Sequence, residues 1–178
     1  MGTPRHRLTF DDLPPAVRRG LEEQLGTTVA EATNRQGGYS PSLAARCRLA
    51  DGRVVFVKAV SPDQNAESPG ILRQEATVSA LLTTAAPAPL LLHVIDDGHW
   101  IVTVFEYIEG SLPTIPWSQP QLVRVLEATW ALAGVEVPLG LPTVAERYGP
   151  ILTGWRNLAA GSGLDGVLDS WALRHVDR

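Results

Sequence analysis

The chain has 178 residues, a net charge of −4 and a hydrophobic fraction of 44%. This composition is sufficient for a packed core and excludes a disordered chain. The sequence contains no basic cluster, no apolar run of membrane-spanning length and no signal-peptide core, so we expect neither nucleic acid nor a membrane as a partner. The one cysteine, Cys47, rules out an internal disulfide and indicates a reducing, cytoplasmic location.

The N-terminal part predicts a helix followed by a strand. A helix is expected over 13–25, with Asp12 as its cap and Gly26 as the residue that ends it. Its apolar residues recur every fourth position and form one packing stripe: Leu13, Val17, Leu21 and Leu25. The following segment, 27–35, is predicted to be the first strand.

The middle of the chain predicts an antiparallel meander. A turn of small residues over 36–42 separates the first strand from a second one at 43–49. The tight turn at 50–52 then leads into a third strand at 54–60. Cys47 falls within the second strand and is interpreted as inert packing.

The next elements are a helix and a hairpin. After a loop over 61–68, Ser68 is expected to cap a helix that begins at Pro69 and runs to about residue 83. Two strands follow at 90–95 and 99–107. The segment Asp96-Asp97-Gly98 between them has the residues of a hairpin turn, which explains the two aspartates better than a metal site does.

The C-terminal part is predicted to be helical. Ser118 is expected to cap a helix that extends to Ala133 and ends at Gly134, and 135–178 is more weakly patterned. Taken together, the elements predict an α+β fold with three parts. These are an N-terminal helical segment (1–26), a small lobe (27–110), and a linker with further helices (111–178).

The third strand contains an unexpected charge. Lys58 lies in an apolar, β-branched run and is the single lysine among 15 lysine and arginine residues. An unpaired ammonium in such a strand is costly, so a partner is expected. Glu75 is the predicted partner because it falls on the apolar stripe of the next helix, with Ile71, Val78 and Leu82. Glu67 is the competing candidate. The alternative is an edge strand whose lysine extends into water.

The order of these features resembles a known family. The small-residue turn (Gly37, Gly38, Tyr39, Ser40), Lys58, Glu75 and the strand exit Val104 to Gly110 are similar to the N-terminal lobe of the protein-kinase-like fold. Within that fold, the similarity is to the aminoglycoside phosphotransferase/choline kinase-like branch. The resemblance covers 27–134 well and 135–178 loosely.

The resemblance implies a nucleotide site. The fold would be α+β, with a five-stranded antiparallel sheet and a helix that carries Glu75. ATP or GTP with Mg²⁺ would be bound by the turn and by Lys58, which Glu75 holds in place. Phe105 would occupy the gatekeeper position. The Glu106 carbonyl and the Ile108 N–H would contact the adenine base.

The sequence also departs from the family. The turn lacks the full G-x-G-x-x-G pattern, and Phe56 stands where protein kinases keep a small alanine, so it either stacks on the base or crowds it. The catalytic aspartate, its asparagine and the metal-binding aspartate are not found. His175-Val176-Asp177 has no room for the asparagine and is rejected as a catalytic loop. No catalytic or metal-ligating residue is therefore assigned.

Three functions follow as alternatives. The first is the nucleotide-binding portion of an ATP-dependent phosphotransferase that acts on a hydroxyl of a small-molecule acceptor, aminoglycoside-like or another metabolite. The chain would then be a small lobe with the first helices of an incomplete large lobe, either a fragment or a natural truncation. The second is a catalytically inactive, pseudokinase-type lobe that senses ATP or binds a partner. The third is an unrelated five-stranded sheet with an edge lysine.

An incomplete lobe has a further consequence for partners. It would expose the apolar surface that packs against its missing half, so self-association is expected.

Overall fold

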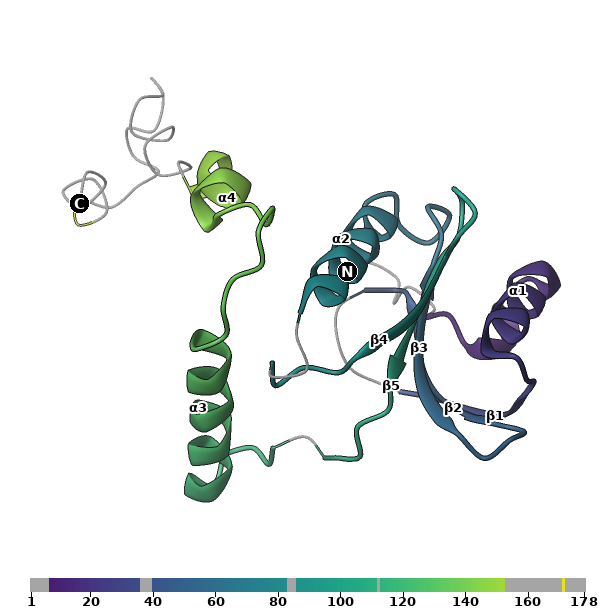
Figure 1. Cartoon of the computed structure of the whole chain (residues 1–178), viewed down its shortest axis with the longest axis horizontal. Helices are drawn as coiled ribbons and strands as arrows, with labels where there is room; N and C mark the ends of the chain where they lie inside the picture. The colour runs from purple at the N-terminus through teal and green to yellow at the C-terminus, as the bar shows by residue number, and fades with distance from the viewer. Residues whose placement is uncertain (1–6, 36–39, 83–85, 112, 153–170, 172–178) are drawn as a thin grey trace. The chain divides into compact units, whose positions relative to one another are not determined.

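The computed structural model describes residues 7–35, 40–82, 86–111, 113–152 and 171 (Figure 1). The α+β class predicted from the sequence is confirmed. In chain order the elements are η1 (Phe10–Asp12), α1 (Pro15–Leu25), β1 (Val29–Asn34), β2 (Leu43–Leu49), β3 (Val54–Val60), α2 (Ser68–Leu81), β4 (Leu91–Asp96), β5 (Ile101–Glu106), α3 (Gln119–Ala133) and α4 (Val144–Leu152). The chain divides into two compact units, Met1–Glu136 and Val137–Arg178.

The strands form one five-stranded sheet in the order β1-β2-β3-β5-β4. Every neighbouring pair is antiparallel, and the predicted meander of the first three strands is confirmed. Both β2 and β3 begin and end at the predicted residues. The order places β3 in the middle of the sheet, so its side chains have strand neighbours on both sides.

The main hydrophobic core lies between α1 and one face of the sheet (Figure 1). The predicted α1 stripe is confirmed, because Leu21 is fully buried and its stripe neighbours are nearly so. The strand residues that face this helix alternate along the chain, as the two-residue period of a half-buried strand requires. On the three central strands they are Leu43, Ala45, Cys47, Leu49, Val55, Val57, Ala59, Val102 and Val104.

The opposite face of the sheet packs against α2 (Figure 1), and its apolar contact is small. The buried cluster there consists of Val60, Leu72 and Ile101. The predicted inward stripe of α2 was wrong, because Ile71 is 62% exposed while Leu72 and Ala76 are buried. The predicted stripe and the buried one both have helical spacing. The buried one is set by Val60 of β3 and Ile101 of β5, which pack against Leu72.

Two predicted helix caps also differ from the structure. The Asp12 carboxylate accepts from the backbone N–H of Thr9 at 2.8 Å, so it caps η1 rather than α1. Ser68 is the first residue of α2 instead of its cap, and Asn65 accepts from its N–H at 3.0 Å. The other predicted signals are confirmed: Gly26 ends α1 with a φ of 71°, and Ser118 forms a capping box with Gln121 at the start of α3.

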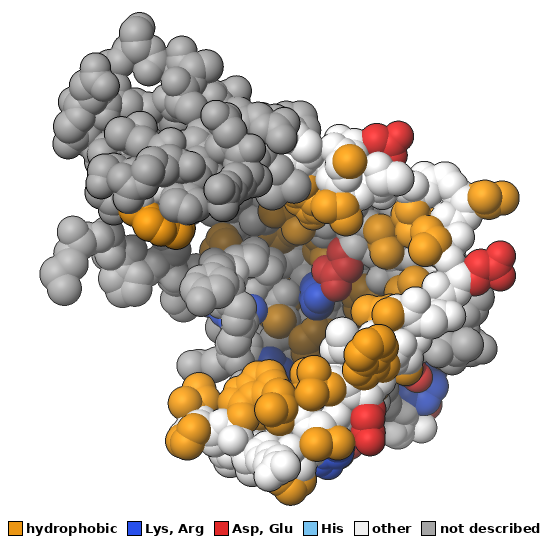
Figure 2. Space-filling view, turned by 90° about the vertical axis from the view of Figure 1, so that its left-hand side faces the viewer, with side chains coloured by type: hydrophobic (Ala, Val, Ile, Leu, Met, Phe, Trp, Pro, Cys, Tyr) orange, Lys and Arg blue, Asp and Glu red, His pale blue; other side chains and the backbone are white. Residues whose placement is uncertain are grey.

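The helix α3 buries none of its side chains. Its exposed apolar residues include Leu122, Val123, Leu126 and Trp130, the last of which is 76% exposed. On the face of the molecule in Figure 2, hydrophobic side chains predominate over charged ones. Among the described helices, none is both long and apolar enough to cross a membrane.

Cys47 was interpreted as a packing residue, and its thiol should therefore be unreactive in the folded protein. The side chain is fully buried, and burial raises the pKa of the thiol to about 12. Because the thiolate is the reactive form, we expect the folded protein to react negligibly with Ellman's reagent at about pH 8. One thiol should react at once in denaturant. Rapid labelling under native conditions would contradict the burial of this strand position.

Candidate functional site

The predicted ion pair between Lys58 and Glu75 is present. The Lys58 Nζ donates to the Glu75 Oε1 at 2.5 Å, joining the middle of β3 to α2. Glu67, the competing partner, is the exposed residue before α2. Glu75 lies beside the buried residues Leu72 and Ala76 rather than among them, so its carboxylate reaches the lysine from the margin of the helix face.

The surroundings of Lys58 exclude the edge-lysine interpretation. Its strand is central, with Ala44 of β2 and Thr103 of β5 as its neighbours in register. The side chains of Lys58 and Glu75 are 30% and 39% exposed. Ion pairs with that much solvent contact contribute about 0–1 kcal/mol to stability. Stability therefore gives little reason for a charge at this position.

Aromatic side chains flank the lysine on the same face of the sheet. Phe56 and Phe105 are partners in register, one row away from Lys58. The Lys58 Nζ lies 5.5 Å from the centroid of the Phe105 ring, within cation–π distance. The lysine ammonium is thus close to both a carboxylate from the helix and an aromatic ring from β5.

The register partner of Lys58 was not singled out in the sequence. Thr103 is fully buried, and its hydroxyl has no hydrogen-bond partner within the described parts of the chain. No pattern signals this residue, because it reads as an ordinary β-strand threonine.

The exit from β5 contains the other predicted contacts. The Glu106 carboxylate accepts from the N–H of Leu90 at 3.0 Å, and the Glu106 N–H donates to the Leu90 carbonyl at 2.9 Å. Ile108 is 57% exposed, and within the described residues its N–H donates no backbone hydrogen bond. This segment is thus fixed to the start of β4 by the paired bonds between Glu106 and Leu90.

Two arginines lie around Tyr107, and no sequence pattern predicted either contact. The Arg35 guanidinium donates to the Tyr107 hydroxyl at 2.5 Å and lies over its ring. Arg46 lies over the same ring, 5.2 Å from its centroid. In the register of the sheet, Arg46 is the partner of Phe56. This places a positive charge one strand away from the aromatic row.

The predicted small-residue turn is described only at its end. Gly37, Gly38 and Tyr39 lie outside the described residues, so their role stays a prediction. The Ser40 hydroxyl lies 3.3 Å from that of Ser68, the first residue of α2. It also accepts from the Ser42 N–H at 3.3 Å. The end of the turn is thus tied to the helix that carries Glu75.

A second ionic contact anchors α2 to the hairpin between β4 and β5. The Arg73 Nε donates to the Asp96 Oδ2 at 2.7 Å, and one terminal nitrogen donates to Oδ1 at 2.8 Å. The same nitrogen donates to the Gly98 carbonyl at 3.3 Å. The Asp96-Asp97-Gly98 segment forms the predicted turn, in which Asp96 accepts from the Gly98 N–H, and Asp97 accepts from the N–H groups of the next two residues. The contact with Arg73 was not predicted.

This contact predicts a response to acid. Hydrogen bonds from Arg73 lower the pKa of Asp96 from its ordinary value of 3.8 to about 2. Since the pKa is lower in the folded state, the stabilisation is complete above about pH 4 and is lost as the pH falls towards about 2. We expect Asp96→Asn to reduce the free energy of urea unfolding more at about pH 5 than at about pH 2.5. An equal reduction at both values would contradict the prediction.

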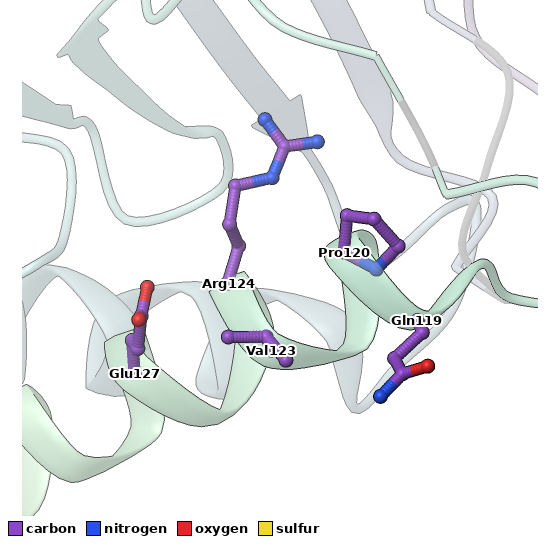
Figure 3. A pocket seen from close by; sticks show the side chains of 5 residues that line it. All are labelled: Gln119, Pro120, Val123, Arg124 and Glu127. Carbon is purple, nitrogen blue, oxygen red and sulfur yellow. The ribbon is translucent and has the colours of Figure 1, made fainter.

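Other features of the described residues do not suggest a site. They include no group of three or more His, Cys, Asp or Glu side chains arranged to hold a metal ion. A hollow of about 630 Å³ lies along α3 and is lined by Gln119, Pro120, Val123, Arg124 and Glu127. Arg124 and Glu127 project to one side of the helix and Gln119 to the other (Figure 3). None of these residues belongs to the predicted nucleotide site.

No protein-family model matches the chain, and no curated protein sequence matches it. One similar solved structure is described as "Putative fructosamine-3-kinase", from Haemophilus somnus 129PT. The sequence identity is 15% and the TM-score is 0.43. The match covers 68% of this chain and 39% of the other, so this chain matches about two fifths of the length of that structure.

Proposed function

We propose that this chain is the nucleotide-binding portion of an ATP-dependent phosphotransferase that acts on a hydroxyl of a small molecule. The observation that carries the proposal is the ion pair between Lys58 and Glu75, which joins a central strand to the following helix. A lysine fixed in this way supplies a compact positive charge for the α- and β-phosphates of ATP. The sheet order and the position of α2 are compatible with a kinase-like small lobe.

The remaining contacts of the nucleotide would come from the same face and from the exit of β5. Phe105 and Phe56 offer aromatic surface for the base, and the Ile108 N–H is an available donor for a ring nitrogen. Mg²⁺ bound to the phosphates would neutralise charge during transfer. This chain's own part in the reaction is to orient the nucleotide and to place the Lys58 ammonium at its phosphates.

The single lysine gives a direct test of nucleotide binding. Protein labelled with [¹³C,¹⁵N]-lysine has one set of lysine side-chain signals, and they all belong to Lys58. We expect Mg·ATP to shift the Lys58 side-chain signals in a saturable manner, while adenosine, which has no phosphates, leaves them almost unchanged. Unchanged signals at millimolar Mg·ATP would refute the proposed role of the lysine.

Transfer is tested separately from binding. Release or transfer of the γ-phosphate in the presence of hydroxyl-bearing acceptors, aminoglycosides among them, would support the phosphotransferase. Saturable binding without any transfer would favour the inactive, ATP-sensing alternative. A parallel titration with Mg·GTP identifies the preferred base. Analytical ultracentrifugation tests the proposed self-association, which predicts a sedimentation coefficient that rises with protein concentration.

A further inference from the structure

Two charged residues of α2 connect this helix to different parts of the sheet. Glu75 reaches Lys58 in β3, whereas Arg73 reaches Asp96 and Gly98 at the end of the β4–β5 hairpin. Each residue of an α-helix turns by about 100°, so positions two apart project about 200° from each other. The two side chains therefore leave nearly opposite sides of α2. A rotation of the helix that withdraws Glu75 from the lysine must also displace Arg73.

The apolar contacts between α2 and the sheet are few and would hold this helix only weakly on their own. The hydrophobic cluster between α2 and the sheet consists of Val60, Leu72 and Ile101, far fewer residues than the core on the α1 side. Hydrophobic attraction is also non-directional, so it leaves the rotation of a helix about its axis poorly determined. Hydrogen bonds depend steeply on angle and can define that rotation.

The group that Arg73 binds is itself held in place. The Asp96 carboxylate accepts from the Gly98 N–H at 3.0 Å as well as from the arginine. Asp97 accepts from the N–H groups of His99 and Trp100 at 2.9 and 2.6 Å, which closes the turn. A planar guanidinium bonded through two nitrogens to such a carboxylate has a defined orientation, which a single point charge lacks.

We propose that Arg73 is a positioning residue that, through its paired bonds to Asp96, fixes the rotation of α2 and keeps Glu75 on Lys58. Arg73 would touch no ligand and would act through Glu75. The functional consequence rests on the proposed nucleotide site, because a lysine released from Glu75 would be a less well-placed phosphate ligand. The effect of Arg73 on the position of the lysine does not depend on nucleotide binding, and it can be measured without nucleotide.

The Lys58 side-chain signals test the proposal directly. In nucleotide-free protein, Glu75→Gln defines the signal positions of an unpaired lysine. We expect Arg73→Gln to move the signals at least halfway to those positions, and the double variant to match Glu75→Gln alone. Arg48→Gln is the matched control, because it also removes an arginine–carboxylate pair, that of Arg48 with Glu31 within the sheet. It should leave the lysine signals in place.

A second variant separates positioning from a general loss of stability. Asp96→Asn keeps an oxygen for the Gly98 N–H but weakens the arginine contact, and it should shift the lysine signals in the same direction as Arg73→Gln. A purely structural role would lower the unfolding midpoint and leave those signals unchanged in the folded protein. Wild-type signals in both variants would overturn the proposal, and so would wild-type signals in the one variant that folds.

Nucleotide titrations then distinguish the two proposals. If the wild type binds Mg·ATP, we expect Arg73→Gln to weaken binding by about fivefold or more, less than removal of Lys58 does. If the wild type does not bind nucleotide but the lysine signals still shift in Arg73→Gln, the positioning role stands and the proposed function fails. Shifted signals together with an unchanged dissociation constant would remove the functional part of the inference.

Discussion

Replacing Lys58 with methionine is expected to abolish the stabilisation of this chain by Mg·ATP while preserving its fold. Methionine retains most of the stem of the side chain and removes the charge that would contact the phosphates. A ligand present at about 100 times its dissociation constant stabilises a protein by about 2.7 kcal/mol. For a chain of this size, that corresponds to a rise of about 5–10 °C in the unfolding midpoint. We expect this rise in the wild type and none in Lys58→Met.

Two controls make the result specific. Arg48→Met also removes one positive charge from the sheet, in an exposed pair with Glu31, and should keep the full thermal shift. Without nucleotide, the free energy of unfolding of Lys58→Met should lie within about 1 kcal/mol of the wild-type value, because the partly exposed ion pair contributes little. An undiminished thermal shift in Lys58→Met would show that the lysine does not bind the phosphates.

The largest loss of stability is expected from Leu21→Ala. Leu21 is fully buried between α1 and the sheet, where the replacement would leave a cavity. Substitutions of this kind cost about 2–5 kcal/mol. Urea unfolding followed by circular dichroism measures the change, and the transition midpoint should fall without a change in its slope.

A leucine on another helix is the matched control. Leu122 lies within α3 and is 43% exposed, so Leu122→Ala should change the free energy of unfolding by less than about 0.5 kcal/mol. Similar losses in the two variants would contradict the assignment of the core to the α1 face. A cost below about 1 kcal/mol for Leu21→Ala would do the same.

Much of the sheet could be predicted because its signals are local. The alternation of β2 and the β-branched run of β3 match the structure residue by residue, and the turn between them contains Gly52 with a φ of 90°. Both strands of the second hairpin were predicted within two residues of their ends. The ends of a strand depend on where its hydrogen bonds to the neighbouring strand stop, and a single sequence predicts these positions only to within a few residues.

The orientation of α2 could not be predicted from its own residues. Ile71 and Leu72 begin two overlapping stripes, and helical spacing favours neither. The structure buries Leu72 because Val60 and Ile101 lie beneath it, and that pairing depends on the order of strands in the sheet. Glu75 lies on the predicted stripe and beside the buried one, so its pairing with Lys58 was predicted correctly although the stripe was not.

The Arg73 contact depends on topology as well. Asp96 ends β4, which is an edge strand beside β5 and is not adjacent to β3. No sequence pattern predicts that α2 contacts the end of that hairpin.

The two faces of the sheet have a consequence for how this protein tolerates change. Along β3, Val55, Val57 and Ala59 pack into the main core, while Phe56 and Lys58 project to the opposite face. The residues of the main core and those that would contact a ligand therefore alternate along one strand and lie on opposite faces of the sheet. Replacing the partly exposed Lys58 would cost little stability, whereas replacing the buried Phe105 would also cost packing energy. Under the proposed function, the charge on β3 could therefore change while the main core is retained.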